Sequence, residues 1–173
     1  ANQSGWVRKA GTAATGNGNT DADPEILVAI GGLAGATDST GLHEPTPVAV
    51  RFVTTSHTNG TSKTMTVEIT YDEGVTVAGS PQIVIANGNQ STDGDGNATL
   101  TYTATGSTAN QIRFTATNLT LSTNDVYTLG GGSQANISLN GGTISDTVRG
   151  GTNQAASLVL TGITAETITV TAS

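Results

Sequence analysis

The feature that most constrains this sequence is a series of short segments, from residue 48 to residue 173, in which apolar and polar residues alternate. A period of two puts successive side chains on opposite faces of a β-strand, so each segment predicts a strand with at least one buried face. The clearest example is residues 64–71, where the predicted buried face consists of Met65, Val67, Ile69 and Tyr71. Threonine, which favours strands, makes up about one-fifth of the chain.

Glycine- and asparagine-rich turns, such as Asn87-Gly88 and Asn140-Gly-Gly142, separate these segments. No window has the pattern of a capped amphipathic helix. Strands at intervals of about 8–12 residues predict an all-β antiparallel sandwich or barrel. The predicted strands are residues 26–30, 48–53, 64–71, 75–77, 81–86, 98–105, 111–117, 135–139, 156–161 and 167–171.

The chain divides into three predicted parts. Residues 1–24 have almost no apolar periodicity and end in the turn signal Asp21–Pro24, so they predict an extended N-terminal arm. Residues 25–60 are predicted to hold N-terminal strands and a loop, packed on the sandwich or on a partner. Residues 61–173 form the predicted sandwich.

Part of the chain resembles a known family. Residues 66–88 (TVEITYDEGVTVAGSPQIVIANG), residues 98–107 (ATLTYTATGS) and residues 137–146 (ISLNGGTISD) are similar in order and spacing to the bacterial immunoglobulin-like domains of tandem adhesins. The resemblance covers about residues 62–172, and it implies an immunoglobulin-like β-sandwich. Family members usually occur as many copies on secreted proteins, whereas this chain has one copy and residues 1–55 have no counterpart.

Composition excludes several classes. The chain has no cysteine, which excludes disulfides, cysteine-ligated zinc and a thiol nucleophile. Its formal net charge of −7 argues against general nucleic-acid binding, which needs a basic surface. No apolar run is long enough, at about 18 residues, to predict a membrane-spanning helix.

Candidate catalytic and metal sites are weak. His43 and His57 lie in predicted loops, where we expect them to be solvated, and Asp72-Glu73 is predicted to form a turn. We therefore expect no enzymatic activity and no cofactor. Asp93, Asp95 and Asn97 alternate like the start of a calcium loop, but Ala104 occupies the position of its bidentate glutamate. A looser surface calcium site and a simple tight hairpin both remain open.

The segment Trp6, Val7, Arg8 and Lys9 is the candidate partner-binding site. It contains the chain's single tryptophan and two of its six basic residues, whereas residues 10–173 carry a formal charge of −9. Tryptophan and arginine dominate binding hot spots. Two placements are open: the segment folds back on its own sandwich as an extra strand, or it docks on a neighbouring subunit or capsid protein.

One immunoglobulin-like module with an N-terminal arm and no recognisable signal peptide resembles virion proteins of tailed bacteriophages. The leading hypothesis is a capsid decoration protein on the virion surface, made in the host cytoplasm. Its expected partners are the major capsid protein or another virion protein and further copies of itself, with a trimer favoured, and neither nucleic acid nor membrane.

The alternative hypothesis is an adhesive or carbohydrate-binding module of a phage fibre or bacterial surface protein. Sugar sites usually stack rings on exposed aromatic side chains, and the chain has six aromatic residues. Phe52, Tyr71, Tyr102 and Phe114 are predicted to be core, which leaves only Trp6 and Tyr127.

Overall fold

A computed structural model describes residues 4–8, 25–30, 44–89, 96–146 and 154–173, and every regular element within them is a β-strand. Contacts divide the chain into two compact units. The first contains Ala1–Leu42 with Arg149–Thr152, and the second contains His43–Val148 with Asn153–Ser173. We call the second unit the body. No described element is a helix capable of crossing a bilayer.

The first unit contains a two-stranded antiparallel sheet, which we call the N-terminal hairpin. Strand β1 (Ser4–Arg8) pairs with β2 (Glu25–Ile30), Trp6 lies opposite Val28, and the register shifts after Trp6. The strand predicted at residues 26–30 is confirmed. For the segment Trp6–Lys9 an extra strand on the sandwich was one of two predicted placements; residues 4–8 do form a strand, and its partner in the structure is β2. The side chains of both strands lie outside the described part of the structure.

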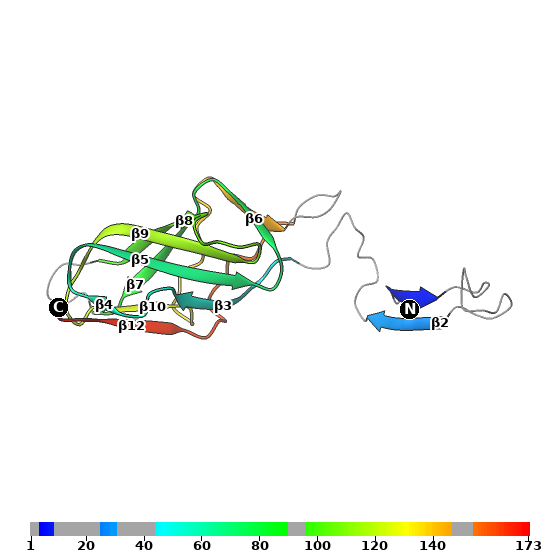
Figure 1. The fold of residues 1–173 in the computed structure, drawn as a ribbon, viewed down its shortest axis with the longest axis horizontal. Coiled ribbons are helices and arrows are strands. Elements are labelled where there is room, and N and C mark those ends of the chain that lie inside the picture. The colour runs from blue at the N-terminus through cyan, green and yellow to red at the C-terminus, as the bar shows by residue number, and fades with distance from the viewer. Residues whose placement is uncertain (1–3, 9–24, 31–43, 90–95, 147–153) are drawn as a thin grey trace. The chain divides into compact units, whose positions relative to one another are not determined.

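The body is built on one curled eight-stranded sheet and a separate strand pair (Figure 1). The order in the large sheet is β3-β5-β9-β8-β7-β10-β12-β4, and all its pairings are antiparallel except that of β12 with β4. Its strands are β3 (Pro47–Phe52), β4 (His57–Thr58), β5 (Gly60–Tyr71), β7 (Gln82–Asn87), β8 (Ala98–Thr103), β9 (Gln111–Leu121), β10 (Val126–Leu129) and β12 (Glu166–Thr171). The separate pair is β6 (Val75–Ala78) with β11 (Thr143–Asp146).

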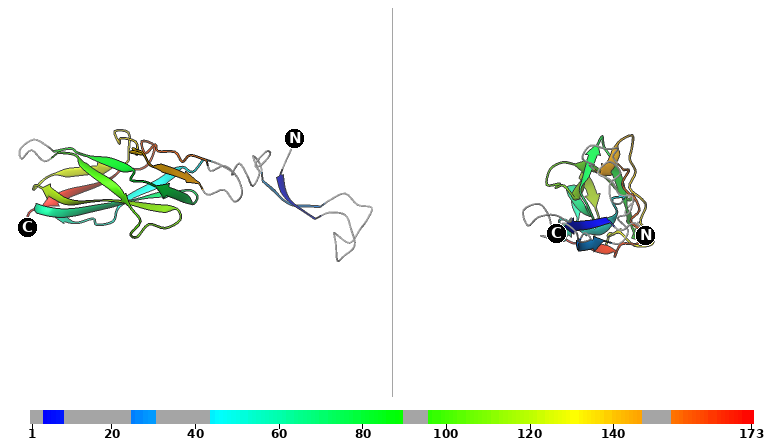
Figure 2. Two further views of the ribbon diagram at one scale, coloured as in Figure 1. Left: turned by 90° about the horizontal axis from the view of Figure 1, so that it is seen from above. Right: turned by 90° about the vertical axis from the view of Figure 1, so that its right-hand side faces the viewer.

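The large sheet curls round on itself (Figure 2). The buried apolar side chains of the described residues form one cluster, which is the core of the body. Burial alternates along β5, where the predicted face of Met65, Val67, Ile69 and Tyr71 is buried, as expected from its period of two. Strand β3 lies beside β12 without a strand ladder between them, and the Phe52 amide donates instead to Glu166 Oε2 at 2.8 Å. This bond connects the two sides of the curled sheet.

The turn directly before β11, in the segment that connects β10 to β11, shows why asparagine and glycine occur there. Asn140 and Gly141 both have positive φ, 46° and 78°, and the Gly142 amide donates to the Leu139 carbonyl at 2.7 Å. This is the backbone of a tight type I′ turn, which asparagine and glycine adopt at little cost. The predicted turn at residues 140–142 is confirmed.

Two predicted strands are wrong. Residues 135–139 and 156–161 form no ladder, and in these regions only isolated bridges are seen, between Gln82 and Ser138 and between Ser145 and Ala155. Their apolar side chains are nevertheless buried, as Ile137 and Leu160 show. The apolar pattern of these two segments therefore indicates buried side chains and not strand pairing. Two strands that the sequence did not predict, β10 and β11, are present instead.

Candidate functional site

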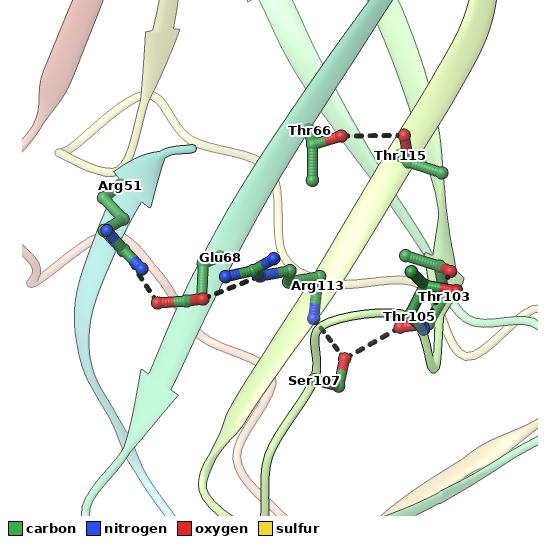
Figure 3. Close-up of polar contacts among 8 residues, drawn as sticks. All are labelled: Arg51, Thr66, Glu68, Thr103, Thr105, Ser107, Arg113 and Thr115. Carbon is green, nitrogen blue, oxygen red and sulfur yellow. Dashed lines mark hydrogen bonds and ion pairs between the residues drawn. The ribbon is translucent and has the colours of Figure 1, made fainter. Parts of the chain in front are cut away.

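A row of charged side chains crosses the outer face of the large sheet (Figure 3). Arg51 on β3 lies opposite Glu68 on β5, and Glu68 lies opposite Arg113 on β9. Arg113 lies in turn opposite Thr103 on β8. Because directly opposed residues on neighbouring strands have adjacent side chains, this register alone brings the two arginines to one carboxylate.

Glu68 is buried although its side chain belongs to the outer face. Its side chain is only 1% exposed, and its two oxygens accept from different arginines: Oε1 from Arg51 Nε at 2.7 Å and Oε2 from Arg113 Nε at 2.8 Å. The arginine side chains are 55% and 26% exposed. Their apolar stems can cover the carboxylate while the guanidinium groups stay in contact with water.

The arginines also fix the ionisation of Glu68. The hydrogen bond from Arg51 is the largest influence and lowers the pKa of the carboxyl, against a smaller raising effect of burial, and Arg113 lowers it further. The same hydrogen bond raises the pKa of Arg51. A buried carboxylate paired in this way stays charged at neutral pH, because the charged form is the one that accepts both hydrogen bonds.

The turn between β8 and β9 holds Arg113 from the other side. Gly106 has φ of +76°, and a Cβ there would lie 2.1 Å from Arg113 Nη1, so the guanidinium lies directly over this glycine. Ser107 Oγ accepts from the Arg113 amide at 2.9 Å and donates to the Thr103 carbonyl at 2.8 Å. Arg113 is therefore positioned by a carboxylate, a glycine and a backbone hydrogen bond.

A hollow of about 350 Å³ lies beside Arg113 on the same face. We call it the threonine hollow, because its lining consists of Val53, Thr54, Thr66, Thr103, Thr105, Arg113 and Thr115. The hydroxyls of Thr66 and Thr115 are 2.9 Å apart, and the Thr105 amide donates to Thr103 Oγ1 at 3.2 Å. The lining is thus rich in threonine, whose methyl groups contribute apolar surface, and it has one fixed guanidinium at its side. The hydroxyls of Thr66 and Thr115 are already hydrogen-bonded, since Thr115 Oγ1 also lies 3.2 Å from the Met65 carbonyl oxygen.

A second polar cluster is structural. Asn87 Nδ2 donates to Asp125 Oδ1 at 2.8 Å, and both residues are buried. Asp125 Oδ2 accepts from the Ser122 amide at 2.9 Å, and Asn87 Oδ1 accepts from the Val126 amide at 3.2 Å. These bonds tie the end of β7 to the turn between β9 and β10, which explains the buried amide and carboxylate.

The structure places few of the predicted site residues. Trp6, Val7 and Arg8 lie on β1, which pairs with β2, but their side chains and all of Lys9 are outside the described residues. Asp93, Asp95 and His43 are also outside them.

The described residues do not settle the calcium prediction. Asn97 is described, and its Oδ1 accepts from the Asn87 amide at 3.1 Å. Over residues 44–89, 96–146, 154–173 and the hairpin strands, no group of three His, Cys, Asp or Glu side chains could hold a metal ion.

Two predictions about single residues are wrong. His57, predicted to be a solvated loop residue, is 6% exposed on β4, and its Nε2 lies 3.0 Å from the Thr54 carbonyl oxygen. It is buried because β4 pairs with the end of β12. Tyr127, counted as available for sugar stacking, is 1% exposed within the core. This burial removes one of the two aromatic residues on which the carbohydrate-binding hypothesis depended.

The sequence alone does not indicate the role of Arg51, Glu68 and Arg113. Each is a charged residue within a predicted strand, and a charged residue at an alternating position predicts solvent exposure. The signal that could have found them is the opposite charge of residues on strands that become neighbours, and it appears only once the register is known.

No family model, curated protein or solved structure matches this chain. The resemblance to bacterial immunoglobulin-like domains therefore stays a prediction from the sequence. The function has to be argued from the geometry of the hairpin and of the body.

Proposed function

We propose that this chain is a non-enzymatic structural protein of a tailed-phage virion, most specifically a capsid decoration protein that binds and stabilises the assembled shell. In this proposal the N-terminal hairpin docks on a partner, and the body projects from the surface. The partner is the major capsid protein or another virion protein. The location is therefore the capsid surface of the virion.

The observation that carries the proposal is the N-terminal hairpin. It is a two-stranded sheet in a compact unit of its own, and the core of the body is made of residues 52–170. Two strands alone are at most marginally stable in water, because they cannot enclose a core. Strand β2 also reads Glu-Ile-Leu-Val-Ala-Ile, which is apolar on both faces. A segment of this kind gains most by burying its faces against another protein.

Trp6 is the proposed anchor of the contact. A large rigid side chain loses little entropy per unit of area that it buries, and Arg8 adds a planar donor on the same strand. The basic residues at this end of the chain have the opposite charge to the acidic remainder. This charge favours a partner with an acidic surface.

The body is proposed to be an immunoglobulin-like β-sandwich, as the family resemblance implies. Its nearly all-antiparallel pairing and its alternating burial support this assignment. A rigid module of this type is suited to a mechanical role, because its shape does not depend on a ligand.

Shell stabilisation follows from mass action. A protein that binds only the assembled shell stabilises that state over free subunits. Many copies on a symmetric lattice add avidity, most strongly if the chain is itself a homo-oligomer, and we propose a trimer. Each contact can then be weak while occupancy stays high.

The experiment is a deletion series measured on purified particles. Removing residues 1–10 deletes β1, and we expect occupancy on the particles to fall by about tenfold or more, because hot-spot losses exceed about 1.4 kcal/mol. The control removes residues 1–3, which precede β1, and should leave occupancy unchanged. Thermal unfolding of both variants checks that the body is folded. Unchanged occupancy after removal of residues 1–10 contradicts the docking role of the hairpin.

A further inference from the structure

The threonine hollow and the arginine row have no role in docking through the hairpin. The hollow has a volume of about 350 Å³, which reaches the lower range of binding sites, and its lining includes five threonines beside the guanidinium of Arg113. Its lining comes from β5, β8 and β9, from the turn between β8 and β9, and from residues 53–54 after β3. Figure 3 labels Thr66, Thr103, Thr105, Thr115 and Arg113 of this lining. The chemistry of the hollow can be argued from the donors that it presents.

The outward-facing donors belong to the arginines. Arg51 and Arg113 each bond Glu68 through Nε, and their Nη atoms have no hydrogen-bond partner among the described residues. The Arg51 side chain is 55% exposed, and that of Arg113 is 26% exposed. Among the described residues that are not exposed, no buried side-chain nitrogen lacks a partner, so the Nη atoms of Arg113 also reach solvent. A guanidinium has donors and no acceptor. A ligand must therefore bring acceptor oxygens, and a carboxylate fits the planar fork with two parallel hydrogen bonds.

The two ends of the arginine row differ in charge. Glu166 acts electrostatically on Arg51, while its Oε2 is bonded to the Phe52 amide. Arg113 is at the other end, where the hollow is lined by uncharged hydroxyls. Arg113 is also held in place by Glu68, Gly106 and Ser107, so little side-chain entropy is left to lose on binding. Of the two arginines, Arg113 can therefore bind an anion with less electrostatic repulsion and a smaller loss of side-chain entropy.

We propose that the threonine hollow binds the carboxylate of an aspartate or glutamate side chain on a partner protein. Arg113 holds the carboxylate, and the hydroxyls of Thr103 and Thr105 bond the polar atoms around it. No aromatic side chain lines the hollow, so a sugar ring has no surface on which to stack. An aspartate or glutamate side chain needs no stacking surface, because the guanidinium and the hydroxyls supply its hydrogen bonds. The inference concerns the body alone and does not depend on docking through the hairpin.

The test is a titration of the ¹⁵N-labelled full chain with a hexaglutamate peptide, followed by NMR. We expect saturable shifts of the Arg113 Nε–Hε signal and of the Thr103 and Thr105 amides, with a Kd of about 1 mM or tighter. Thr105→Val, at an exposed position, should weaken binding by about fivefold through loss of one hydroxyl bond. Arg113→Lys keeps the charge, loses the fork and should weaken binding by about tenfold.

The matched control is Lys63→Gln, which removes one positive charge from β5 outside the hollow and should leave Kd unchanged within about twofold. Shifts that do not saturate, or equal weakening by Lys63→Gln and Thr105→Val, would overturn the inference, since either indicates general charge attraction. Sodium acetate giving the same shifts at equal carboxylate concentration shows an adventitious ion only. Tighter binding of trigalacturonate than of hexaglutamate assigns the hollow to an acidic glycan and overturns the protein partner.

Discussion

Glu68 shows how a single residue can be both buried and charged on the outside of a sheet. Its carboxylate is enclosed by two guanidinium groups at 2.7 and 2.8 Å, so its desolvation is compensated by two charge-assisted hydrogen bonds. The change in folding stability depends on how many of the three residues are replaced. Replacing all three residues by apolar ones costs little in such clusters, whereas removing one member leaves the others uncompensated.

Glu68→Gln is therefore expected to lower the free energy of unfolding by about 1–3 kcal/mol at pH 7, less than for a fully buried pair because both arginines reach solvent. The pKa of Glu68 is lowered in the folded state, so its contribution is complete above the unfolded pKa of about 4.3 and is lost as the pH falls through the folded pKa. Urea unfolding at pH 7 and pH 3 measures both effects, and the difference between the two proteins should shrink at pH 3.

Glu44→Gln is the control, because Glu44 is exposed and its loss should change stability by less than about 0.5 kcal/mol. A deficit of Glu68→Gln that is equally large at pH 3 would show that packing, and not the charge, accounts for the loss.

The elements of this fold were predictable to different degrees. Strands with strict alternation, such as β5 and β9, were found because a period of two is a local signal. The four-residue strands β10 and β11 were missed because they are defined by distant partners, as in the pairing of Thr143 with Ala78. The arginine row was missed for the same reason, since it needs the register of three strands. The sequence did single out Trp6, but its side chain lies outside the described residues.

The turn between β8 and β9 holds Arg113 of the arginine row in position, and Gly106 is the critical residue of this turn. Gly106→Ala places a Cβ at φ of +76° and against Arg113 Nη1, so we expect a loss of about 1–3 kcal/mol in unfolding free energy. Gly141→Ala is the matched control, because Gly141 has φ of +78° and a Cβ there meets nothing within 4 Å. Urea unfolding of both variants measures the difference. Equal stability of the two would contradict the placement of Arg113 over this turn.

At the scale of the whole molecule, the chain divides into two compact units, and the body carries a core of its own. The core residues lie between Phe52 and Val170, and Ser173 is tied to the same body, because its Oγ donates to Asn59 Oδ1 at 2.6 Å. The stability of the body should therefore be independent of the N-terminal segment, as the docking proposal requires.

This independence predicts that a chain lacking residues 1–42 keeps the stability of the body. Because the core residues lie between Phe52 and Val170, the free energy of unfolding in urea should change by less than about 1 kcal/mol. A chain that ends at Val170 is the control for sensitivity: it loses the pairing of Thr171 with Thr58 and the bonds of Ser173 to Asn59, and should be less stable by about 1–2 kcal/mol. If removing residues 1–42 costs more than removing residues 171–173, the hairpin contributes to the body's core. The docking proposal would then have to be replaced by one in which the N-terminal strands complete the fold.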